Sequence, residues 1–382
     1  MEAEQERKRR EIVHTSHSHH TVPIISAAED LIPSSERHRS FLSLSSPIHP
    51  KNETQKSRTP RQSMEEEQSD GNKPHEAPTE LRDWSDLTTV CLINIFQRLS
   101  LADRWLIAMR VCRSWSDAAR DCCLYAALDL EPAFDASGAG RPDTAAWWTP
   151  AFQRRVDSMM RSVAEWSDGA LKEVRVRHCS DEALCFLAER SPELLILSVR
   201  SSRGVTDRSM SKVAMSCTNL VELDISNCYE VSYRSIEIIG LNCPNLTTLK
   251  RNLLNWLDPS QHRGVIPEDY LNALPQDGDT EALSISRFMV KLKHLELRFS
   301  KFSGHGLMAI AEACKDLESL DLFGCANLTS RGIEQARAKL TKLIPNGLVK
   351  PNFYIPRSVF HTDRYGHWNL YDERFQTSVF QI

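Results

Sequence analysis

The sequence lacks both a long hydrophobic run and an excess of one charge. Its 382 residues include 47 Lys and Arg against 51 Asp and Glu, which gives a formal net charge of −4. A membrane-spanning helix needs about 20 apolar residues in succession, and contact with nucleic acid or anionic lipid relies on a basic surface. The first 30 residues also lack the apolar core of a signal peptide. We therefore expect protein partners, no nucleic acid and no membrane, and a location in the nucleus, the cytoplasm or both.

Sequence motifs of catalysis and metal binding are missing too. There is no GxxxxGK[ST] phosphate loop, no HExxH zinc motif and no GxSxG nucleophile turn, and the 14 glycines are scattered along the chain. The eleven cysteines are an odd number and include no CxxC pair, which favours reduced thiols over a disulfide framework or a zinc site. We expect a protein that is not an enzyme and that has no cofactor.

Residues 1–79 show no apolar periodicity and are expected to form a disordered N-terminal extension. Residues 1–63 include 20 Ser, Thr or Pro, a composition that buries too little apolar surface to offset the entropy of ordering. The basic run at 7–10 is compatible with nuclear import, and the four histidines at 14–20 with metal binding, but both are also typical of a solvated tail, which we favour. An alternative start of translation is Met64, which would leave residues 1–63 out of the natural protein.

Residues 87–122 predict three short amphipathic helices. Apolar residues recur at spacings of three or four, in the sets Leu92, Ile95, Phe96 and Leu99, then Trp105, Ala108 and Met109, then Val111, Trp115, Ala118 and Cys122. Ser100, followed three residues later by Asp103, is typical of a helix N-terminus. Three short helices cannot cover all of their own apolar surface, so this segment needs a partner.

A Leu-x-x-Leu-x-Leu pattern then recurs six times. The first leucines stand at positions 171, 194, 220, 246, 292 and 317, at intervals of 23, 26, 26, 46 and 25 residues. A period near 26 lies in the range of leucine-rich repeats, in which each unit contributes one strand and one helix that are stable only when stacked. Helices are expected at 181–190, 207–216, 233–242 and 304–313, and most cysteines recur at fixed positions of the repeat, where we expect them to be buried.

The interval of 46 residues contains an insertion at 251–278 that includes Trp256 and Tyr270. Insertions in solenoids form loops on one face, and this one is either a surface excursion or a flap that contacts a target. The turn-rich residues 131–150 are expected to link the helices to the first repeat, and the stretch from Trp147 to Val163 to cap the solenoid. The tail after residue 352 contains eight of the 28 aromatic residues and is expected either to cap the last repeat or to contribute a recognition surface.

The stretch LTTVCLINIFQRLS at 87–100 resembles the first half of an F-box, and VCRSW at 111–115 resembles its characteristic ending. F-boxes bind Skp-family adaptors in SCF ubiquitin ligases. The resemblance implies that the core of the F-box and its adaptor contacts are formed by Leu87, Leu92, Phe96, Leu99, Leu101, Leu106, Val111, Cys112 and Trp115. The family usually has Pro and Glu where this chain has Thr88 and Val90. Since Pro presets the backbone for a first helical turn, we expect a weaker start of this helix.

The order of elements resembles plant F-box/leucine-rich-repeat proteins of the Skp-interacting-partner type. The resemblance implies an α/β fold, divided into an F-box at 80–125, a linker and cap at 126–168, a solenoid of about six repeats at 169–343 and an aromatic tail at 344–382. It also implies a non-catalytic substrate receptor that binds the adaptor, through it a cullin, and an unidentified target. The alternative is a non-degradative leucine-rich-repeat scaffold. Candidate target contacts are Trp256, Tyr270, Arg175, Arg200 and Arg298, on a strand face that also includes Arg177, Asp224 and Glu296.

Overall fold

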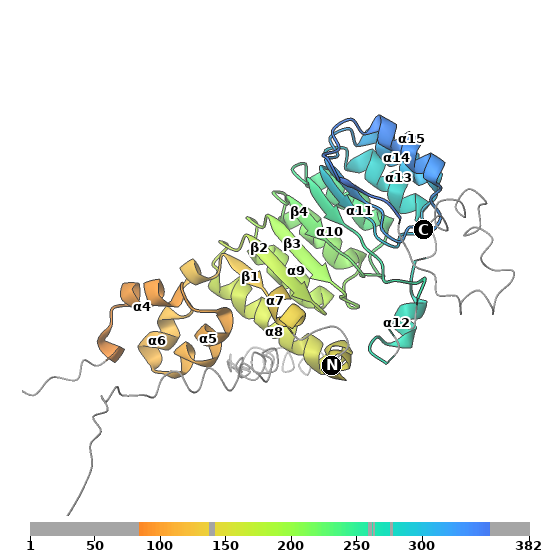
Figure 1. Ribbon diagram of the computed structural model, residues 1–382. Helices are drawn as coiled ribbons and strands as arrows, with labels where there is room; N and C mark the ends of the chain where they lie inside the picture. The colour runs from red at the N-terminus through yellow and green to blue at the C-terminus, as the bar shows by residue number, and fades with distance from the viewer. Residues whose placement is uncertain (1–83, 137–141, 259–261, 263, 276–277, 352–382) are drawn as a thin grey trace, which may run out of the picture.

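The computed structural model describes residues 84–136, 142–258, 262, 264–275 and 278–351 (Figure 1). The N-terminal extension up to residue 83 and the tail from residue 352 lie outside the described residues, as do the predictions made for them. Within the described part of the chain, no helix combines the length and the apolar character needed to cross a lipid bilayer.

The N-terminal bundle consists of three short α-helices and three 3-10 turns. In chain order these are η1 (Trp84–Asp86), α4 (Thr89–Phe96), α5 (Leu101–Leu106), η2 (Ala108–Arg110), α6 (Arg113–Ala118) and η3 (Cys122–Leu124). The amide of Asp103 donates to the Ser100 hydroxyl at 3.1 Å, which confirms the predicted start of the second helix. At the start of α4, Thr88 has the extended backbone of an N-cap residue but makes no side-chain capping bond.

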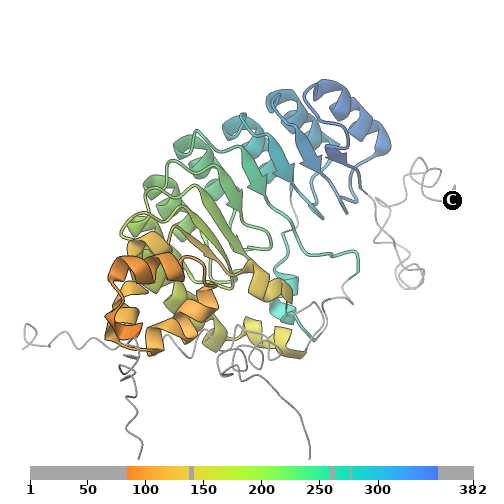
Figure 2. The same cartoon turned by 60° about the vertical axis from the view of Figure 1, so that its left-hand side comes forward.

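Behind the bundle, the described residues form one sheet of eight parallel strands in chain order. The strands are β1 (Ala127–Asp129), β2 (Glu173–Arg177), β3 (Ile196–Arg200), β4 (Glu222–Asp224), β5 (Thr248–Lys250), β6 (His294–Glu296), β7 (Ser319–Asp321) and β8 (Leu348–Val349). Figure 2 shows that the sheet is curved, with the strands inside the arc and the helices outside it. This is the architecture of a leucine-rich-repeat solenoid.

Helices cover the convex side, one beside the next. They are α8 (Pro150–Trp166), α9 (Asp181–Arg190), α10 (Asp207–Ser216), α11 (Tyr233–Asn242), α13 (Asp279–Phe288), α14 (Gly304–Ala313) and α15 (Ser330–Lys339). The short helices α7 (Glu131–Ala136) and α12 (Glu268–Asn272) and the 3-10 turn η4 (Pro142–Trp148) lie outside this row. All six strands and all four helices predicted from the repeat pattern are present.

The sheet extends past the predicted repeats at both ends. Leu128 of β1 pairs with Val174 of β2, so residues 126–168 form the first turn of the solenoid rather than a linker. The turn-rich stretch at 131–150 joins β1 to α8, while the connection between bundle and sheet is only the two residues after η3. At the other end, β8 pairs with β7. Both strands escaped the sequence pattern because they lack the full leucine motif: by the register of the pairing, Tyr125 replaces the first leucine before β1, and Pro345 and Lys350 replace the first and third leucines around β8.

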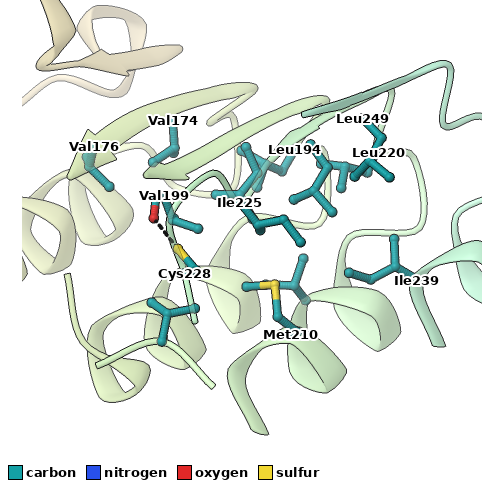
Figure 3. Packing of buried hydrophobic residues seen from close by; sticks show 14 of the residues in the cluster. Val174, Val176, Leu194, Val199, Met210, Leu220, Ile225, Cys228, Ile239 and Leu249 are labelled. Atoms are coloured by element: carbon teal, nitrogen blue, oxygen red, sulfur yellow. Dashed lines mark hydrogen bonds between the residues drawn. The ribbon is translucent and has the colours of Figure 1, made fainter. Parts of the chain in front are cut away.

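The core repeats with the strands, as Figure 3 shows for the central repeats. Leucine and valine side chains from strands β1 to β7 point toward the helices and are fully buried. The buried cysteines occupy equivalent positions: the Cys228 thiol donates to the Val199 carbonyl at 3.0 Å, and Cys325 donates to Leu297 at 3.0 Å. Burial raises the pKa of both thiols to about 12. These cysteines are therefore packed, protonated core residues, in agreement with the prediction.

Two local structural features recur from repeat to repeat. The residue that leaves a strand adopts a left-handed backbone in His178, Ser201, Asn227, Phe299 and Gly324. In addition, an aspartate at the first position of one helix accepts hydrogen bonds from the backbone amide and hydroxyl of the N-cap residue of the next helix, in the pairs Asp181–Thr206, Asp207–Ser232 and Asp279–Ser303. Each such pair satisfies an amide that a helix N-terminus would otherwise leave open and fixes the register between neighbouring repeats.

The insertion at 251–278 begins with Arg251, whose side chain is almost fully buried. It stands where the other repeats have a third apolar residue, such as Ile225 or Leu297. Its guanidinium donates to the carbonyls of Ile225, Cys228 and Val231 and pairs with Glu281 of α13 at 2.9 Å. Arg251 therefore places a charge in the core of this repeat, and the partners of its guanidinium all belong to the solenoid.

The rest of the insertion folds back toward the start of the solenoid. In both views α12 lies beside the segment of η4, far from it in sequence. Tyr270 of α12 stacks on Tyr229, with ring centroids 4.6 Å apart, and contacts Trp148 at the same distance. Asp269 pairs with Arg203. The insertion therefore ties the middle of the solenoid to its first turn.

Candidate adaptor-binding and target-binding surfaces

The predicted adaptor residues divide into a core and a surface group. Leu92 and Phe96 have no exposed surface, and the Phe96 ring packs against Trp115 with centroids 5.3 Å apart. Six others are half-buried: Leu87, Leu99, Leu101, Leu106, Cys112 and Trp115. Val111 is 52% exposed. Of the nine residues, Val111 is thus the most available to a partner, and Leu92 and Phe96 can only support the surface from inside.

The bundle also exposes apolar side chains that the sequence analysis did not assign to the adaptor contact. These are Trp84, Val90, Ile95 and Ile107. For Trp84, Val90 and Ile107 a sequence signal existed, because each is apolar yet lies outside the stripes that the helix period assigns to the core. Ile95 gave no such signal, because it lies on the predicted stripe and is nevertheless 40% exposed. Trp84 is held by its backbone, since the Trp115 indole N–H donates to the Trp84 carbonyl at 3.1 Å. With Val111, these four residues make up what we call the exposed bundle surface.

On another side, the bundle is packed firmly against the solenoid. Trp166 at the end of α8 contacts Trp105 of α5 and Tyr125, with ring centroids 5.8 and 5.3 Å apart. The Trp105 indole N–H donates to the Tyr125 hydroxyl at 3.1 Å, and this hydroxyl donates to the Ala119 carbonyl at 2.6 Å. Bundle and solenoid share one continuous hydrophobic core, so the bundle packs directly on the solenoid.

The concave face is formed by the strand residues that point away from the helices. On β2, for example, Val174 and Val176 are buried, whereas Glu173, Arg175 and Arg177 are partly exposed on the other side. Arg175 pairs with Glu173 at 2.6 Å and with Glu222 of β4 at 3.2 Å. Lys250 pairs with the same Glu222 at 3.2 Å. Burial acts to raise the pKa of Glu222, but the two cations prevail and lower it.

A second group of charges surrounds Glu131 at the start of α7. Glu131 pairs with Arg177 and, at 3.2 Å, with Arg200, which also lies 3.7 Å from Asp224. Burial raises the pKa of Asp224, although hydrogen bonds from Ser226 and the charge of Arg200 act to lower it. The predicted target-binding arginines Arg175 and Arg200 are thus engaged in internal ion pairs that brace neighbouring strands.

Arg298 lies at the C-terminal half of the same face. It pairs with Asp321 through two nitrogen atoms, at 2.7 and 2.8 Å, yet its side chain is half exposed. Beside it, the rings of Phe299 and Phe323 meet edge to face with centroids 5.5 Å apart. Phe323 belongs to the exposed apolar residues. This corner combines a partly free guanidinium with an accessible aromatic ring.

The two aromatic residues predicted in the insertion hold it in place. Tyr270 is buried by the stacking described above, and burial raises the pKa of its phenol well above the usual value. The Trp256 indole N–H donates to the Phe299 carbonyl at 2.7 Å, and Lys301 lies 4.9 Å from the centre of its ring. Of the two interpretations of these side chains, the geometry supports the one in which they anchor the loop.

The described residues offer little for a metal or a small ligand. One group, formed by Asp121 and by Cys122 and Cys123 of η3, has its ligand atoms within 4.8 Å of one another. Hydrogen bonding to Asp121 and the charge of this carboxylate raise the pKa of Cys123, which disfavours the thiolate that metals bind. A cavity of about 130 Å³ between the ends of α11 and α13 is lined by Gly240, Phe288 and Lys291 among others. It is smaller than the several hundred Å³ of typical ligand sites.

Comparison with known proteins agrees with this geometry. Residues 84–126 match the F-box domain, which implies binding of a Skp adaptor in an SCF complex. The chain is 49% identical to F-box protein SKIP1 of Arabidopsis thaliana over 302 residues, covering 78% of this chain and 98% of the relative. It is 44% identical to putative F-box/LRR-repeat protein 19 of the same plant, over 75% of this chain and 93% of that one.

Among solved structures, the Rad7 and Elc1 complex in yeast aligns over 55% of this chain and 56% of the other, at 16% identity. The TM-score of 0.30 is too low to support any argument. The relatives at 49% and 44% identity match nearly their whole length. Together with the F-box and the solenoid, they show that this chain belongs to the plant F-box/leucine-rich-repeat proteins of the Skp-interacting-partner type.

Proposed function

We propose that this chain is a substrate-recognition subunit of an SCF-type ubiquitin ligase that binds one target protein and promotes its ubiquitination and degradation. The F-box binds a Skp-family adaptor and, through it, a cullin. The solenoid holds the target. The chain itself contributes proximity and orientation, while other subunits carry out the transfer. We place this activity in the nucleus, the cytoplasm or both.

The observation that carries the proposal is the exposed bundle surface on a bundle that is otherwise fixed. Trp84, Val90, Ile95, Ile107 and Val111 are apolar and accessible, although the bundle has a solenoid beside it that could have covered them. Exposed apolar residues that gather on one surface of a folded protein typically mark an interaction site, and we propose that these five side chains form such a surface. We assign the adaptor contact to this surface together with the half-buried leucines of the prediction.

For the target we assign the C-terminal half of the concave face. Arg175 and Arg200 form ion pairs within the solenoid. A target that bound them would have to break these pairs, which would reduce the net binding free energy. Arg298 is also paired, with Asp321, but its side chain is half exposed and can contact a target without leaving that pair, and Phe323 offers an accessible ring beside it. An arginine next to an aromatic ring is also the combination that is enriched in interface hot spots.

The adaptor contact is tested with a matched pair of variants. Val111→Asp places a charge on the exposed bundle surface, and Leu241→Asp places one on α11, where the side chain is 66% exposed. Neither side chain is in the core, so both variants should fold. We expect Val111→Asp to weaken binding to a purified Skp adaptor about 30-fold, the equivalent of a hot spot of about 2 kcal/mol. Leu241→Asp should bind like the unmodified chain.

Equal adaptor binding by the two variants would remove the exposed bundle surface from the proposal. Leu92→Asp would not serve as a test, because Leu92 is completely buried and a charge there would unfold the bundle. The alternative function, a non-degradative scaffold, predicts that the intact chain does not bind the adaptor at all. It also predicts that deletion of residues 84–122 leaves the amount of every bound protein in the cell unchanged.

A further inference from the structure

The last strand of the described sheet has a free edge. β8 ends the strand order and pairs only with β7. The carbonyls of Gly347 and Val349 accept hydrogen bonds from Leu320 and Leu322 of the β7 side at 2.7 and 2.9 Å. Because alternate residues of a strand direct their backbone groups to opposite neighbours, the N–H and C=O groups of Leu348 and Lys350 face away from β7. A free edge of this kind is a template for another strand.

Exposed apolar side chains surround this edge. Ile344 is 51% exposed, Val349 41% and Phe323 36%. The last helix, α15, does not share this property, since its residues outside the core are mostly charged or polar. A terminal repeat normally presents a polar outer surface. Here the helix side of the last repeat meets that condition and the sheet side does not.

The chain that follows has the composition of a strand. The last described residue is Pro351, two residues after β8. The segment 352–382 contains two identical Ser-Val-Phe triplets, at 358–360 and at 378–380, among eight aromatic residues. Valine and aromatic residues favour strands.

We infer that residues 357–361 add to the free edge of β8 as an antiparallel strand and cover Ile344, Val349 and Phe323. An antiparallel partner can follow β8 after a short loop, whereas a parallel one needs a crossover of about a dozen residues or more. Eight residues separate the end of β8 from the first triplet, and 28 residues separate it from the second. Since closing a longer loop costs more entropy, the nearer triplet is the occupant. This role of the tail does not depend on the proposed function.

Amide hydrogen exchange with single-residue resolution tests the inference on the full chain. The amides of Leu348 and Lys350 should exchange on the order of 10-fold more slowly than in a chain ending at Pro351, because a hydrogen-bonded amide exchanges only when its strand opens. The Val349 amide, on the β7 side, serves as the internal reference. Val359→Pro and Phe360→Pro supply the point variants. Since only alternate residues of a strand donate to one neighbour, at least one of them must remove a ladder bond and speed the exchange.

The second triplet supplies the matched controls, Val379→Pro and Phe380→Pro. In both control variants we expect the amides of Leu348 and Lys350 to exchange at the same rate as in the unmodified chain. Equal exchange at Leu348 and Lys350 in the full and truncated chains would overturn the inference, and so would an equal effect of the control variants. Protection that rises with protein concentration, accompanied by a dimer in light scattering, would assign the edge to a second copy instead. Adaptor binding, measured on the same samples, should be the same for all of them and reports separately on the proposed function.

Discussion

Arg251 is the residue whose role depends most on its surroundings. Three backbone carbonyls and the carboxylate of Glu281 rely on its guanidinium, which is buried in the solenoid. Arg251→Leu places at this position the kind of apolar residue that the other repeats have, but it leaves these acceptors without a donor. We expect a loss of about 3 kcal/mol in the free energy of unfolding, measured by urea titration.

The matched control for Arg251 is the double variant Arg251→Leu with Glu281→Gln. It removes the buried charge that the single variant leaves unpaired, so it should recover about 1 kcal/mol of the loss. An unchanged urea midpoint for Arg251→Leu would mean that the space beside the insertion accepts leucine as the other repeats do, and that the ion pair contributes no net stability.

His178 predicts a pH dependence of stability. Burial among Phe134, Trp147 and Trp148, together with the charge of Arg177, lowers the pKa of its imidazole to about 3. In the unfolded chain the pKa is about 6.5. Below pH 6.5 the unfolded state therefore binds a proton at this imidazole that the folded state does not bind. The stability that the neutral imidazole contributes is fully present above pH 6.5 and is lost as the pH falls toward 3. The free energy of unfolding should fall by about 2 kcal/mol between pH 7 and pH 5.

The comparison variant for this effect is His178→Asn. Asparagine accepts the left-handed backbone of this position and has no proton to gain. Urea titrations at pH 7 and pH 5 should show a variant that is less stable at pH 7, because it packs less surface, but that loses about 2 kcal/mol less than the unmodified chain on acidification. Parallel losses in both proteins would show that the imidazole is not the group responsible.

At the scale of elements, the insertion connects two parts of the solenoid that are distant in the sequence. Tyr270 carries most of this contact through Tyr229 and Trp148, but its hydroxyl is buried and has no hydrogen-bond partner among the residues that the structure describes. Tyr270→Phe should therefore keep stability or raise it by up to about 1 kcal/mol. Tyr270→Ala should lose about 3 kcal/mol of local stability, visible as faster hydrogen exchange at 264–275 than elsewhere.

The two substitutions at Tyr270 separate packing from hydrogen bonding. A loss in Tyr270→Phe as large as that in Tyr270→Ala would mean that the hydroxyl has a partner, such as a buried water. The repeated helices provide the reference within the same experiment, because exchange in α9 and α14 should be the same in both variants.

At the scale of the whole molecule, the contact at Trp166 decides whether the F-box has a fixed orientation. Because bundle and solenoid share one core, we expect a single cooperative transition in thermal unfolding. Trp166→Ala removes the ring that contacts Trp105 and Tyr125. It should separate the transition into two, with the bundle melting first.

The same variant tests whether orientation matters for function. Adaptor binding by Trp166→Ala should be retained at temperatures where the bundle remains folded, while ubiquitin transfer to a bound target should fall, because a mobile F-box holds the target at variable distances. Met215→Ala, a change of an exposed apolar residue on α10, is the control. Full transfer by Trp166→Ala would show that a flexible arrangement serves equally well.

The sequence by itself determined the repeat and its elements. The 26-residue period, the helical stripes and the cap at Ser100 are local patterns, and local backbone geometry follows from them. The buried state of Leu92, Phe96 and the repeated cysteines also follows from the apolar stripes and the repeat period, but the same stripes include Ile95 and Val111, which are 40% and 52% exposed.

Only the tertiary structure decided which residues remain exposed or become paired. Val111 and Ile95 are apolar in the sequence like Leu92, but their exposure depends on what packs beside the bundle. In the sequence nothing indicates a partner for Arg175 or Arg200. In the fold, Glu222 and Glu131 each lie 3.2 Å from one of these arginines. The start of the solenoid at β1 and the path of the insertion back to Trp148 follow likewise from contacts between segments far apart in the chain, which no local period records.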